Sequence, residues 1–420
     1  MKETIAIVAT CDTKGEEAAF LRDRVLSYGA VPLVIDTGVL GEPVKVVPDV
    51  SRHDVASEAG YTIEQLIAFG TRGDAVERMR EGLNRLVARL HGEGGIQGLI
   101  AIGGAEGALL GRSAMDALPF GVPKLTVSTI ASGRHLFSDI IGYNDAMAMH
   151  SVIDILGINS ISRTVFANAV AAVVGMVRAK REAGEQRPRI GISMLGTTTP
   201  PILRVVKPRL EELGYEVLTF HANGVGGACM DDLVRQNYFA GILDFSPNEL
   251  VANLFGGLHQ CKSDRMEPAM EQGMPVIVAP GSSSIIVLSR EEALAEGYEG
   301  RNKYYHNPEI TLVRCSREEM RRIGRSFAEK MNLAKGPVKF LYPMRGFSSQ
   351  DKEGLTMYDP PGNEIFLEEL RKTLRKDIPI LEIDAHINDD EFAAAACDQL
   401  LEVMDRGGTA KGRDRQTHRH

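Results

Sequence analysis

Apolar runs of strand length recur along the chain, and six of them lead directly into short loops of Gly, Ser, Thr and Asp. In the first half IAIVAT, GLIAIGG and PKLTVST lead into CDTKG, AEGA and IASG; in the second half RIGISMLG, EVLTF and MPVIVAP lead into TTTP, HANGVGG and GSSS. Segments with helical spacing of apolar residues, such as residues 16–28, separate the runs. This alternation predicts an α/β fold with mainly parallel sheets, whose strand ends form a row at which ligands bind.

The alternation stops and restarts around a polar run, KREAGEQRP, at residues 180–188. We therefore expect two Rossmann-like domains, residues 1–187 and 188–408, followed by a disordered polar tail at 409–420. The segment before the polar linker, FANAVAAVVGMV at residues 166–177, is apolar on most sides of a helix. Such a helix is normally buried, and we expect it between the domains or between two subunits of a homodimer. Residues 62–90 also show helical spacing, with Gly70 and Gly73 as expected breaks.

Composition narrows the class of protein. A net charge of −8 and a pI near 5.8 argue against a nucleic-acid-binding surface spread over the chain. The five cysteines form no CxxC pair, which favours reduced thiols over a disulfide framework or a zinc site. The N-terminus lacks the apolar core of a signal peptide, and we expect no apolar stretch of membrane-spanning length. These features predict a cytoplasmic protein that binds no membrane.

The loop TCDTKGEE after the first strand is the first candidate anion site. The hydroxyls of Thr10 and Thr13, the ammonium group of Lys14 and the loop amides would bind a phosphate, and Asp12 would orient a ligand or a metal. The alternative is that Asp12 or Thr13 only caps the following helix. The loop is not a P-loop, which requires GxxxxGK followed by Ser or Thr. At the end of the second strand, Asp36 would bind ribose hydroxyls or simply begin a turn.

Two further loops of the first half follow core strands. Gly103, Gly104 and Gly107 in GGAEGA, and Ser128 and Thr129 before IASG, would let a ligand approach the main chain closely. Tight turns or close helix packing are the structural alternative. No GxGxxG follows the first strand, so a nicotinamide dinucleotide is disfavoured.

The second half offers a polar rim for a small anionic ligand. Its expected ligand-binding residues, which would also serve as ordinary caps, are Thr197, Thr198, Thr199, Asn223, Gly226, Gly227, Gly281, Ser282 and Ser283. If the chain is an enzyme, His221 and His386 would carry protons beside Asp384, and Arg345 would clamp an anion. No HExxH motif or Cys/His cluster is present, which disfavours a tightly bound transition metal, and the identity of any metal stays open.

Longer segments resemble a known family. They are ATCDTKGEE, GGAEGALLGRSAMDALP, GVPKLTVSTIASG, GTTTPP, FHANGVGG, ILDFSPNE, PGSSS, YYHNPEITLVR, FLYPMRGFSSQDKEG and EIDAHINDDEF. Together with the run that begins at Asp139, they are similar to the bacterial family related to a plant tobamovirus-resistance protein, over nearly all of residues 1–405. The resemblance implies two Rossmann-like domains, ATP binding and dimerisation. The chain departs from the family where GGAEGA replaces a GGSGGT-like loop, because Glu106 would repel phosphate unless a metal bridges them.

The preferred hypothesis is therefore a nucleotide-binding protein with ATP, and with Mg²⁺ where a metal is needed, in its first half. A small carboxylate or phosphorylated metabolite would bind in the second half or between the halves. Two alternatives stay open. One is a non-catalytic, ATP-responsive dimeric module that binds a protein partner; the other is a sugar-acid-type hydrolase or lyase that does not use ATP.

Overall fold

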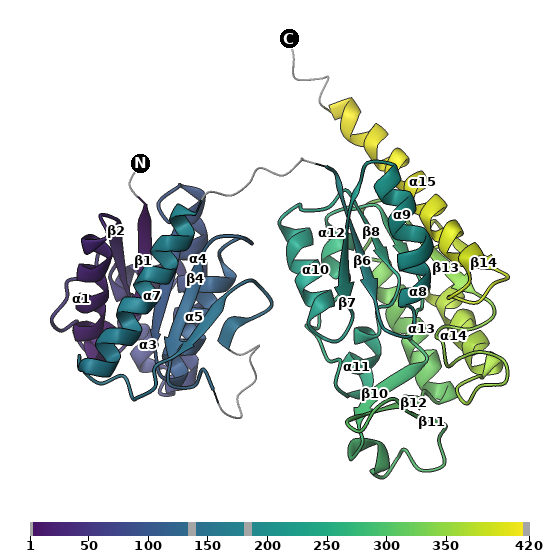
Figure 1. Cartoon of the computed structure of the whole chain (residues 1–420), viewed down its shortest axis with the longest axis horizontal. Coiled ribbons are helices and arrows are strands. Elements are labelled where there is room, and N and C mark those ends of the chain that lie inside the picture. The colour runs from purple at the N-terminus through teal and green to yellow at the C-terminus, as the bar shows by residue number, and fades with distance from the viewer. Residues whose placement is uncertain (1–2, 133–139, 180–186, 415–420) are drawn as a thin grey trace. The chain divides into compact units, whose positions relative to one another are not determined.

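The computed structural model describes residues 3–132, 140–179 and 187–414, and the chain divides into two compact units, residues 1–183 and 184–420 (Figure 1). Most of the expected polar linker at 180–188 therefore lies outside the described residues. Both units are Rossmann-like, with helices on both faces of a parallel sheet. The α/β class that the alternating pattern predicts is confirmed. Each unit is described separately below.

The sheet of the first unit is parallel throughout its described strands and has the order β2-β1-β3-β4-β5. Its strands are β1 (Thr4–Ala9), β2 (Val31–Asp36), β3 (Gly98–Gly103), β4 (Lys124–Ser128) and β5 (Met147–His150). Its helices are α1 (Cys11–Ser27), α2 (Arg52–Glu58), α3 (Ile63–Ala68), α4 (Arg72–Gly92), α5 (Ala105–Asp116) and α7 (Ser160–Arg178). Because β2 lies on one side of β1 and β3 on the other, the chain changes direction between β1 and β3, which is where ligands of open α/β sheets bind.

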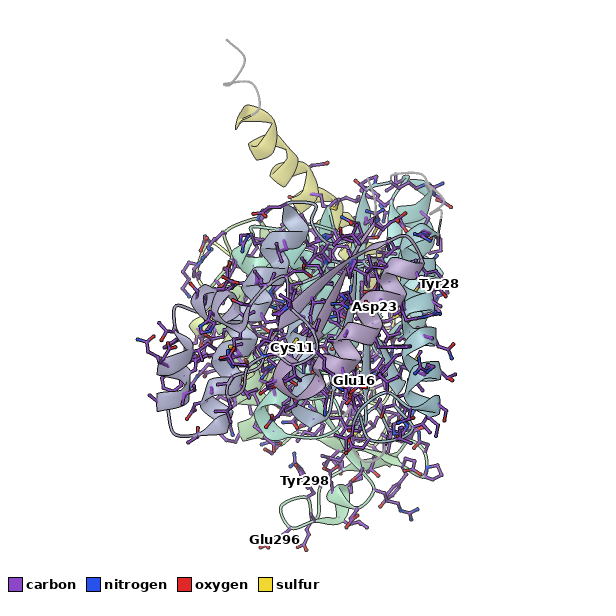
Figure 2. All side chains as sticks on the ribbon, turned by 90° about the vertical axis from the view of Figure 1, so that its left-hand side faces the viewer. Cys11, Glu16, Asp23, Tyr28, Glu296 and Tyr298 are labelled. Carbon is purple, nitrogen blue, oxygen red and sulfur yellow. The ribbon has the colours of Figure 1, made fainter. Side chains whose placement is uncertain are left out.

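Helices cover both faces of this sheet. Side chains of α1 and α7 pack on the face of the sheet that carries Ile5 and Ile7 of β1. Side chains of α2 to α5 pack on the opposite face, which carries Ala6 and Val8. Figure 2 shows α1 with Cys11 in its first turn and Tyr28 just beyond its last. The expected break in the 62–90 helix is confirmed at Gly70: α3 ends at Ala68, Gly70 has a φ of +75°, and α4 begins at Arg72. The break expected at Gly73 is wrong, because Gly73 lies within the first turn of α4.

The apolar helix of residues 166–177 is part of α7. Phe166, Val170 and Val173 are buried within the first unit, in one cluster with strand residues such as Ile100. Its apolar face is therefore used inside its own unit. Among the described residues, α7 is also the helix that is long and apolar enough to cross a membrane, by length and composition alone. The expectation that no apolar stretch reaches that length is therefore wrong. The core of this unit is built from apolar residues of α7, and these residues give the helix the composition of a membrane-spanning segment.

The second unit is built on a six-stranded parallel sheet of order β14-β13-β9-β8-β6-β7, with an antiparallel sheet of order β10-β12-β11 beside it. Its strands are β6 (Arg189–Met194), β7 (Glu216–His221), β8 (Gly241–Asp244), β9 (Val276–Val278), β10 (Ile285–Ser289), β11 (Lys303–Tyr305), β12 (Ile310–Arg314), β13 (Val338–Pro343) and β14 (Ile380–Ile383). Here the chain changes direction between β6 and β8.

The helices of the second unit also form two layers. They are α8 (Thr199–Pro201), α9 (Lys207–Glu212), α10 (Gly226–Arg235), α11 (Glu249–Phe255), α12 (Glu267–Glu271), α13 (Arg317–Met331), α14 (Pro360–Thr373) and α15 (Asp390–Asp414), with a π-helical turn η1 (Ile202–Val206) and a 3-10 turn η2 (Glu292–Leu294). The helices α10 to α14 cover one face, and η1, α9 and α15 cover the other. Because α15 runs to Asp414, the first six residues of the expected 409–420 tail are helical, and residues 415–420 lie outside the described residues.

Candidate functional site

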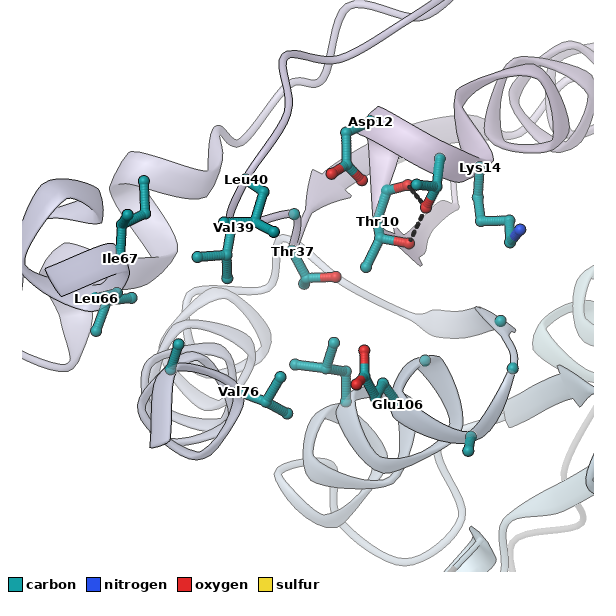
Figure 3. Close-up of a pocket in the computed structure, with 18 of the residues that line it drawn as sticks. Thr10, Asp12, Lys14, Thr37, Val39, Leu40, Leu66, Ile67, Val76 and Glu106 are labelled. Atoms are coloured by element: carbon teal, nitrogen blue, oxygen red, sulfur yellow. Dashed lines mark hydrogen bonds between the residues drawn. The ribbon is translucent and has the colours of Figure 1, made fainter. Parts of the chain in front are cut away.

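A cavity of about 780 Å³ opens at the carboxyl ends of β1, β2 and β3 (Figure 3). Four segments line it: the β1–α1 loop, the loop after β2, the first turn of α5, and the α3–α4 connection. This is the point at which the chain changes direction in the sheet, as the strand order predicts for a ligand site.

The β1–α1 loop, by which we mean Thr10 and the first turn of α1, supplies a polar wall; the helix begins at Cys11, earlier than the expected residue 16. Thr10 is the N-cap of α1, but its side chain makes no capping bond; its Oγ1 lies 3.0 Å from Oγ1 of Thr13 instead. Lys14 has non-helical backbone angles (φ −126°, ψ 23°), so α1 is kinked at this residue. Thr10, Asp12, Thr13 and Lys14 all line the cavity, and neither Asp12 nor Thr13 is the N-cap. The Oδ2 atom of Asp12 accepts a hydrogen bond from the Gly41 amide at 3.2 Å.

At the end of β2, Asp36 and Thr37 have different roles. Asp36 is fully buried, and its Oδ1 accepts hydrogen bonds of 2.9 Å from the amides of Cys11 and Gly38. It holds the two loops together and is not part of the cavity lining, and its Oδ2 has no hydrogen-bond partner among the described residues. Ribose binding by Asp36 stays a prediction. Thr37 does line the cavity; it is 2% exposed, and its hydroxyl has no hydrogen-bond partner among the described residues. Figure 3 shows this hydroxyl between Thr10 and Glu106.

The first turn of α5 forms the opposite side of the polar wall. Gly103 has a φ of +156°, and a Cβ there would lie 2.7 Å from Cα of Gly107, so the turn needs glycine. Gly104 is the N-cap and offers no side chain. The first amides of a helix have no partner within it, and here Ala105, Glu106 and Gly107 all line the cavity. The carboxylate of Glu106 therefore stands beside the donor groups, where the departure from the family motif places it.

An apolar wall, which no motif in the sequence predicts, completes the cavity. Its residues come from the loop after β2 and from the α3–α4 region: Val39, Leu40, Leu66, Ile67 and Val76. Leu66 is buried, whereas Ile67 is 48% exposed and Leu40 is 75% exposed. Figure 3 shows this wall on the side of the cavity away from Lys14. The helical spacing of residues 62–90 identified Leu66 and Ile67 only as core candidates, and the break at Gly70 was the one signal that they could turn toward a ligand.

Ser128 and Thr129 are close to this site but do not line it. Ser128 is fully buried, and its Oγ accepts a hydrogen bond of 3.3 Å from the amide of Ile130. Thr129 lies behind the α5 turn, where a Cβ on Gly104 would be 3.9 Å from its Oγ1. The structure thus brings together the predicted residues of β1–α1 and β3–α5, and leaves out those of the β4 loop.

In the second unit, the predicted hydroxyl-rich loops hydrogen-bond to one another. Oγ1 of Thr197 lies 2.6 Å from Oγ of Ser282, and the hydroxyls of Thr198 and Thr199 donate to the Leu195 carbonyl at 3.0 and 2.8 Å. Ser282 has a left-handed φ of +57°, and it is fully buried, as is Ser283. These hydroxyls hold the strand-end loops in place. Gly281 belongs to the same packing, because its Cβ position lies 2.2 Å from the Phe245 carbonyl.

The glycines of the β7–α10 loop are required by close packing. A Cβ on Gly226 would lie 2.1 Å from the His221 carbonyl, and one on Gly227 would lie 2.2 Å from Nε of Arg265. The amide of Gly227 donates to Oε1 of Glu249 at 3.0 Å, so a carboxylate of the chain itself occupies the start of α10. Asn223 is exposed, and its Oδ1 accepts a hydrogen bond of 3.4 Å from the Val225 amide.

Three of the four predicted catalytic residues, Arg345, Asp384 and His386, are neighbours beyond β13 and β14, and His221 lies at the end of β7, the opposite edge strand. Arg345 and Asp384 are both exposed and form a two-bond ion pair, with both N–O distances 2.9 Å, which lowers the pKa of Asp384. His386 is buried; its Nε2 lies 2.9 Å from the Ser348 carbonyl, and its Nδ1 accepts from the Asn388 amide at 3.1 Å.

Both ring nitrogens of His386 are therefore engaged by backbone groups, while His221 stands exposed at the end of β7. Among the described residues, no group of three or more His, Cys, Asp or Glu side chains is placed to hold a metal ion.

Comparison with known proteins follows the division into two units. Residues 3–182 match the N-terminal domain, and residues 187–404 the C-terminal domain, of the uncharacterised protein family UPF0261. The chain belongs to this family. A UPF0261 protein of Clostridium tetani is 39% identical over 408 residues, 97% of this chain and all of that protein. A UPF0261 protein of Brucella suis is 35% identical, over 96% of this chain and 95% of the relative.

A plant relative confirms the resemblance seen in the sequence. The tomato (Solanum lycopersicum) ToMV resistance protein Tm-1(GCR237) is 32% identical to this UPF0261 chain over 418 residues, which cover 94% of this chain and 55% of the tomato protein. Among solved structures, a putative UDP-N-acetylglucosamine 2-epimerase from Listeria monocytogenes is 8% identical, with a TM-score of 0.23. The match covers 66% of this chain and 79% of the epimerase chain. MurG of Acinetobacter baumannii is 9% identical, with a TM-score of 0.22, and the match covers 96% of this chain and 100% of the MurG chain. Such distant matches say nothing about activity.

Proposed function

We propose that the first unit binds a nucleotide, with ATP as the expected ligand. The observation that carries the proposal is that one cavity combines a polar wall, made by the β1–α1 loop and the start of α5, with an apolar wall from Val39 to Val76. A nucleotide has the same division, with a charged phosphate chain at one end and a flat apolar base at the other. The volume of about 780 Å³ is within the range of small-molecule sites.

The polar wall supplies the groups that phosphates require. Lys14 provides a positive charge on the same side of the cavity as Thr10 and Thr13, whose hydroxyls hydrogen-bond to each other at 3.0 Å. The start of α5 adds backbone amides and the positive end of the helix dipole. The buried hydroxyl of Thr37 has no partner among the described residues, and a ligand oxygen would satisfy it.

Two carboxylates in the lining, those of Asp12 and Glu106, imply that a cation accompanies the phosphates. Mg²⁺ is commonly held by one or two carboxylates together with substrate phosphates, so the ion would enter with ATP and need no cluster of protein ligands. Its charge would remove the repulsion between Glu106 and a phosphate. We therefore expect MgATP to bind more tightly than ATP alone.

Isothermal titration calorimetry of the full chain tests the proposal with four ligands: ATP, ADP, inorganic triphosphate and adenosine, each with and without Mg²⁺. Lys14→Ala should weaken ATP and triphosphate but leave adenosine unchanged, and Lys376→Ala, an exposed lysine of the second unit, is its control. Ile67→Asp should weaken ATP and adenosine but leave triphosphate unchanged. Its control is Leu26→Asp, which places the same charge at a 54% exposed position outside the cavity.

If ATP gives no heat and no thermal shift with Mg²⁺ present, the nucleotide proposal is wrong. If ATP binds but both site variants bind it like the wild type, the site is wrong. A phosphate-release assay on the same samples then separates an ATP-using enzyme from an ATP-responsive binding module, because only the enzyme turns ATP over.

A further inference from the structure

The second unit contains a histidine held in one orientation by a side-chain amide. His259 follows α11, is 9% exposed, and has its Nδ1 2.8 Å from Oδ1 of Asn248. The Nδ2 group of Asn248 donates both its hydrogens, to the carbonyls of Ser282 (2.7 Å) and Ile285 (2.9 Å). Because the amide nitrogen is used up in this way, the oxygen faces His259, and Nδ1 of the ring must carry the hydrogen.

The other ring nitrogen, Nε2, is then an acceptor with a lone pair. It has no hydrogen-bond partner in the part of the chain that the structure describes. Burial, with a contribution from His221, lowers the pKa of His259 to about 4, so the ring is unprotonated at neutral pH. An unprotonated imidazole oriented through its Nδ1–H presents the lone pair of Nε2 to a hydrogen-bond donor.

A second histidine is fixed close to the first. His221 ends β7, and the loop that follows it packs on the backbone of His259: a Cβ on Gly224 would lie 3.1 Å from the His259 carbonyl carbon. The same loop is tied to α11 through the bond from the Gly227 amide to Glu249. Two consecutive residues, Asn248 and Glu249, thus position His259 and the loop that carries His221.

The support for this arrangement is a fully buried group of charges. Arg265 makes two hydrogen bonds to Asp244, of 2.7 and 2.8 Å, and lies 3.4 Å from Glu249 and 3.7 Å from Asp231. All four side chains are 2% exposed or less. Burying so many charges costs free energy that an apolar core would not, which favours a role in holding neighbouring groups rigidly.

The surroundings indicate the kind of ligand. The loops after β6, β7 and β8 lie where the chain changes direction in the sheet, and the exposed Asn223 offers a neutral side-chain amide there. The cations of this region are paired, Lys262 with Asp232 at 2.7 Å and Arg265 with Asp244. Neutral donors and acceptors suit a hydroxyl-bearing ligand better than a phosphate.

We propose that Nε2 of His259 is the hydrogen-bond acceptor of a second site in this protein, with Asn248 as its positioning residue, and that the site takes a small neutral, hydroxyl-bearing compound of the sugar type. In the contact proposed, a hydroxyl group of the ligand donates a hydrogen bond to Nε2, and no covalent bond forms or breaks. The site lies in the second unit and does not depend on nucleotide binding in the first.

The tautomer of His259 provides the first test. Protein labelled with ¹⁵N in its histidine rings is examined by long-range ¹H–¹⁵N NMR at pH 6, and His259→Gln assigns the signal. We expect a neutral ring with hydrogen on Nδ1, at a pH where an ordinary histidine is largely protonated. A protonated ring, or hydrogen on Nε2, overturns the proposal. Asn248→Asp, which keeps the acceptor but adds a charge, should make the ring protonate at higher pH; an unchanged titration in a folded variant overturns the positioning role.

Ligand binding provides the second test. D-Ribose should shift the Nε2 signal and inorganic phosphate should not; a shift with phosphate alone makes this an anion site and overturns the ligand class, and a shift with neither overturns the site.

Discussion

Replacing Asp231 with Asn should change how the stability of the second unit depends on pH. Burial raises the pKa of Asp231 from 3.8 to about 7, although the Arg265 guanidinium opposes the shift. Burial lowers the pKa of His259 from 6.5 to about 4. Between pH of about 4.5 and 6.5 the folded protein keeps an Asp231 proton that the unfolded chain has released. The unfolded chain keeps a His259 proton that the folded protein has released.

The two groups therefore act in opposite directions. The stability linked to Asp231 is lost as pH rises toward 7, and that linked to His259 is lost as pH falls toward 4. Each changes the free energy of unfolding by up to about 1.4 kcal/mol per pH unit, the value for one proton, so they nearly cancel in the wild type. In the Asp231→Asn variant residue 231 no longer titrates, so of these two groups only His259 makes the free energy of unfolding depend on pH. Relative to wild type, the Asp231→Asn variant should gain about 2–3 kcal/mol of stability as the pH rises from about 4.5 to 6.5.

Urea denaturation at pH values of about 4.5, 5.5 and 6.5, followed by circular dichroism, measures this difference, and limited proteolysis assigns the transition to the second unit. Asp232→Asn is the matched control, because it makes the same change at the next residue on α10, which is partly exposed. His259→Gln should show the opposite slope to Asp231→Asn. A difference between Asp231→Asn and wild type that does not vary with pH would refute the reasoning.

Three further variants test other parts of the structure. Thr37→Val removes a buried hydroxyl that lacks a partner in the described chain, so it should weaken ATP binding several-fold by calorimetry while the melting temperature stays equal or rises. Gly227→Ala places a Cβ 2.2 Å from Nε of Arg265 and should lower the free energy of unfolding by about 3 kcal/mol or more in urea. Phe166→Ala should cost the first unit about 3–5 kcal/mol and leave the second unit unchanged in hydrogen exchange, because Phe166 is buried inside the first unit.

Much of the fold could be predicted because strands buried on both faces read as continuous apolar runs. The six runs that lead into polar loops correspond to strands β1, β3, β4, β6, β7 and β9, all in the two parallel sheets. The role of residues 166–177 could not be predicted in the same way. Helical spacing shows that a helix has a wide apolar face, but it does not show what covers that face, and here the sheet of the helix's own unit does so.

The candidate site could be predicted in part. The polar wall followed from loop composition, since Thr10, Thr13, Lys14 and the glycines after β3 line one cavity. The apolar wall did not, because Leu66 and Ile67 look like any other residues on the apolar face of a helix. His259 was also missed: no motif surrounds it, and its orientation depends on Asn248, eleven residues earlier in the chain.

The two units show why the composition of a loop predicts the position of hydrogen-bond donors better than their availability. Thr37 and Thr197 both follow a strand of a parallel sheet, and both belong to loops that would suit an anion. Thr37 has no partner in the described chain, whereas Thr197 is paired with Ser282, a serine that the chain supplies 85 residues later. A hydroxyl that the chain has already satisfied gains little from a ligand, because binding only exchanges one hydrogen bond for another. Function should therefore be sought first where the fold leaves a polar atom unpaired, at Thr37 in the first unit and at Nε2 of His259 in the second.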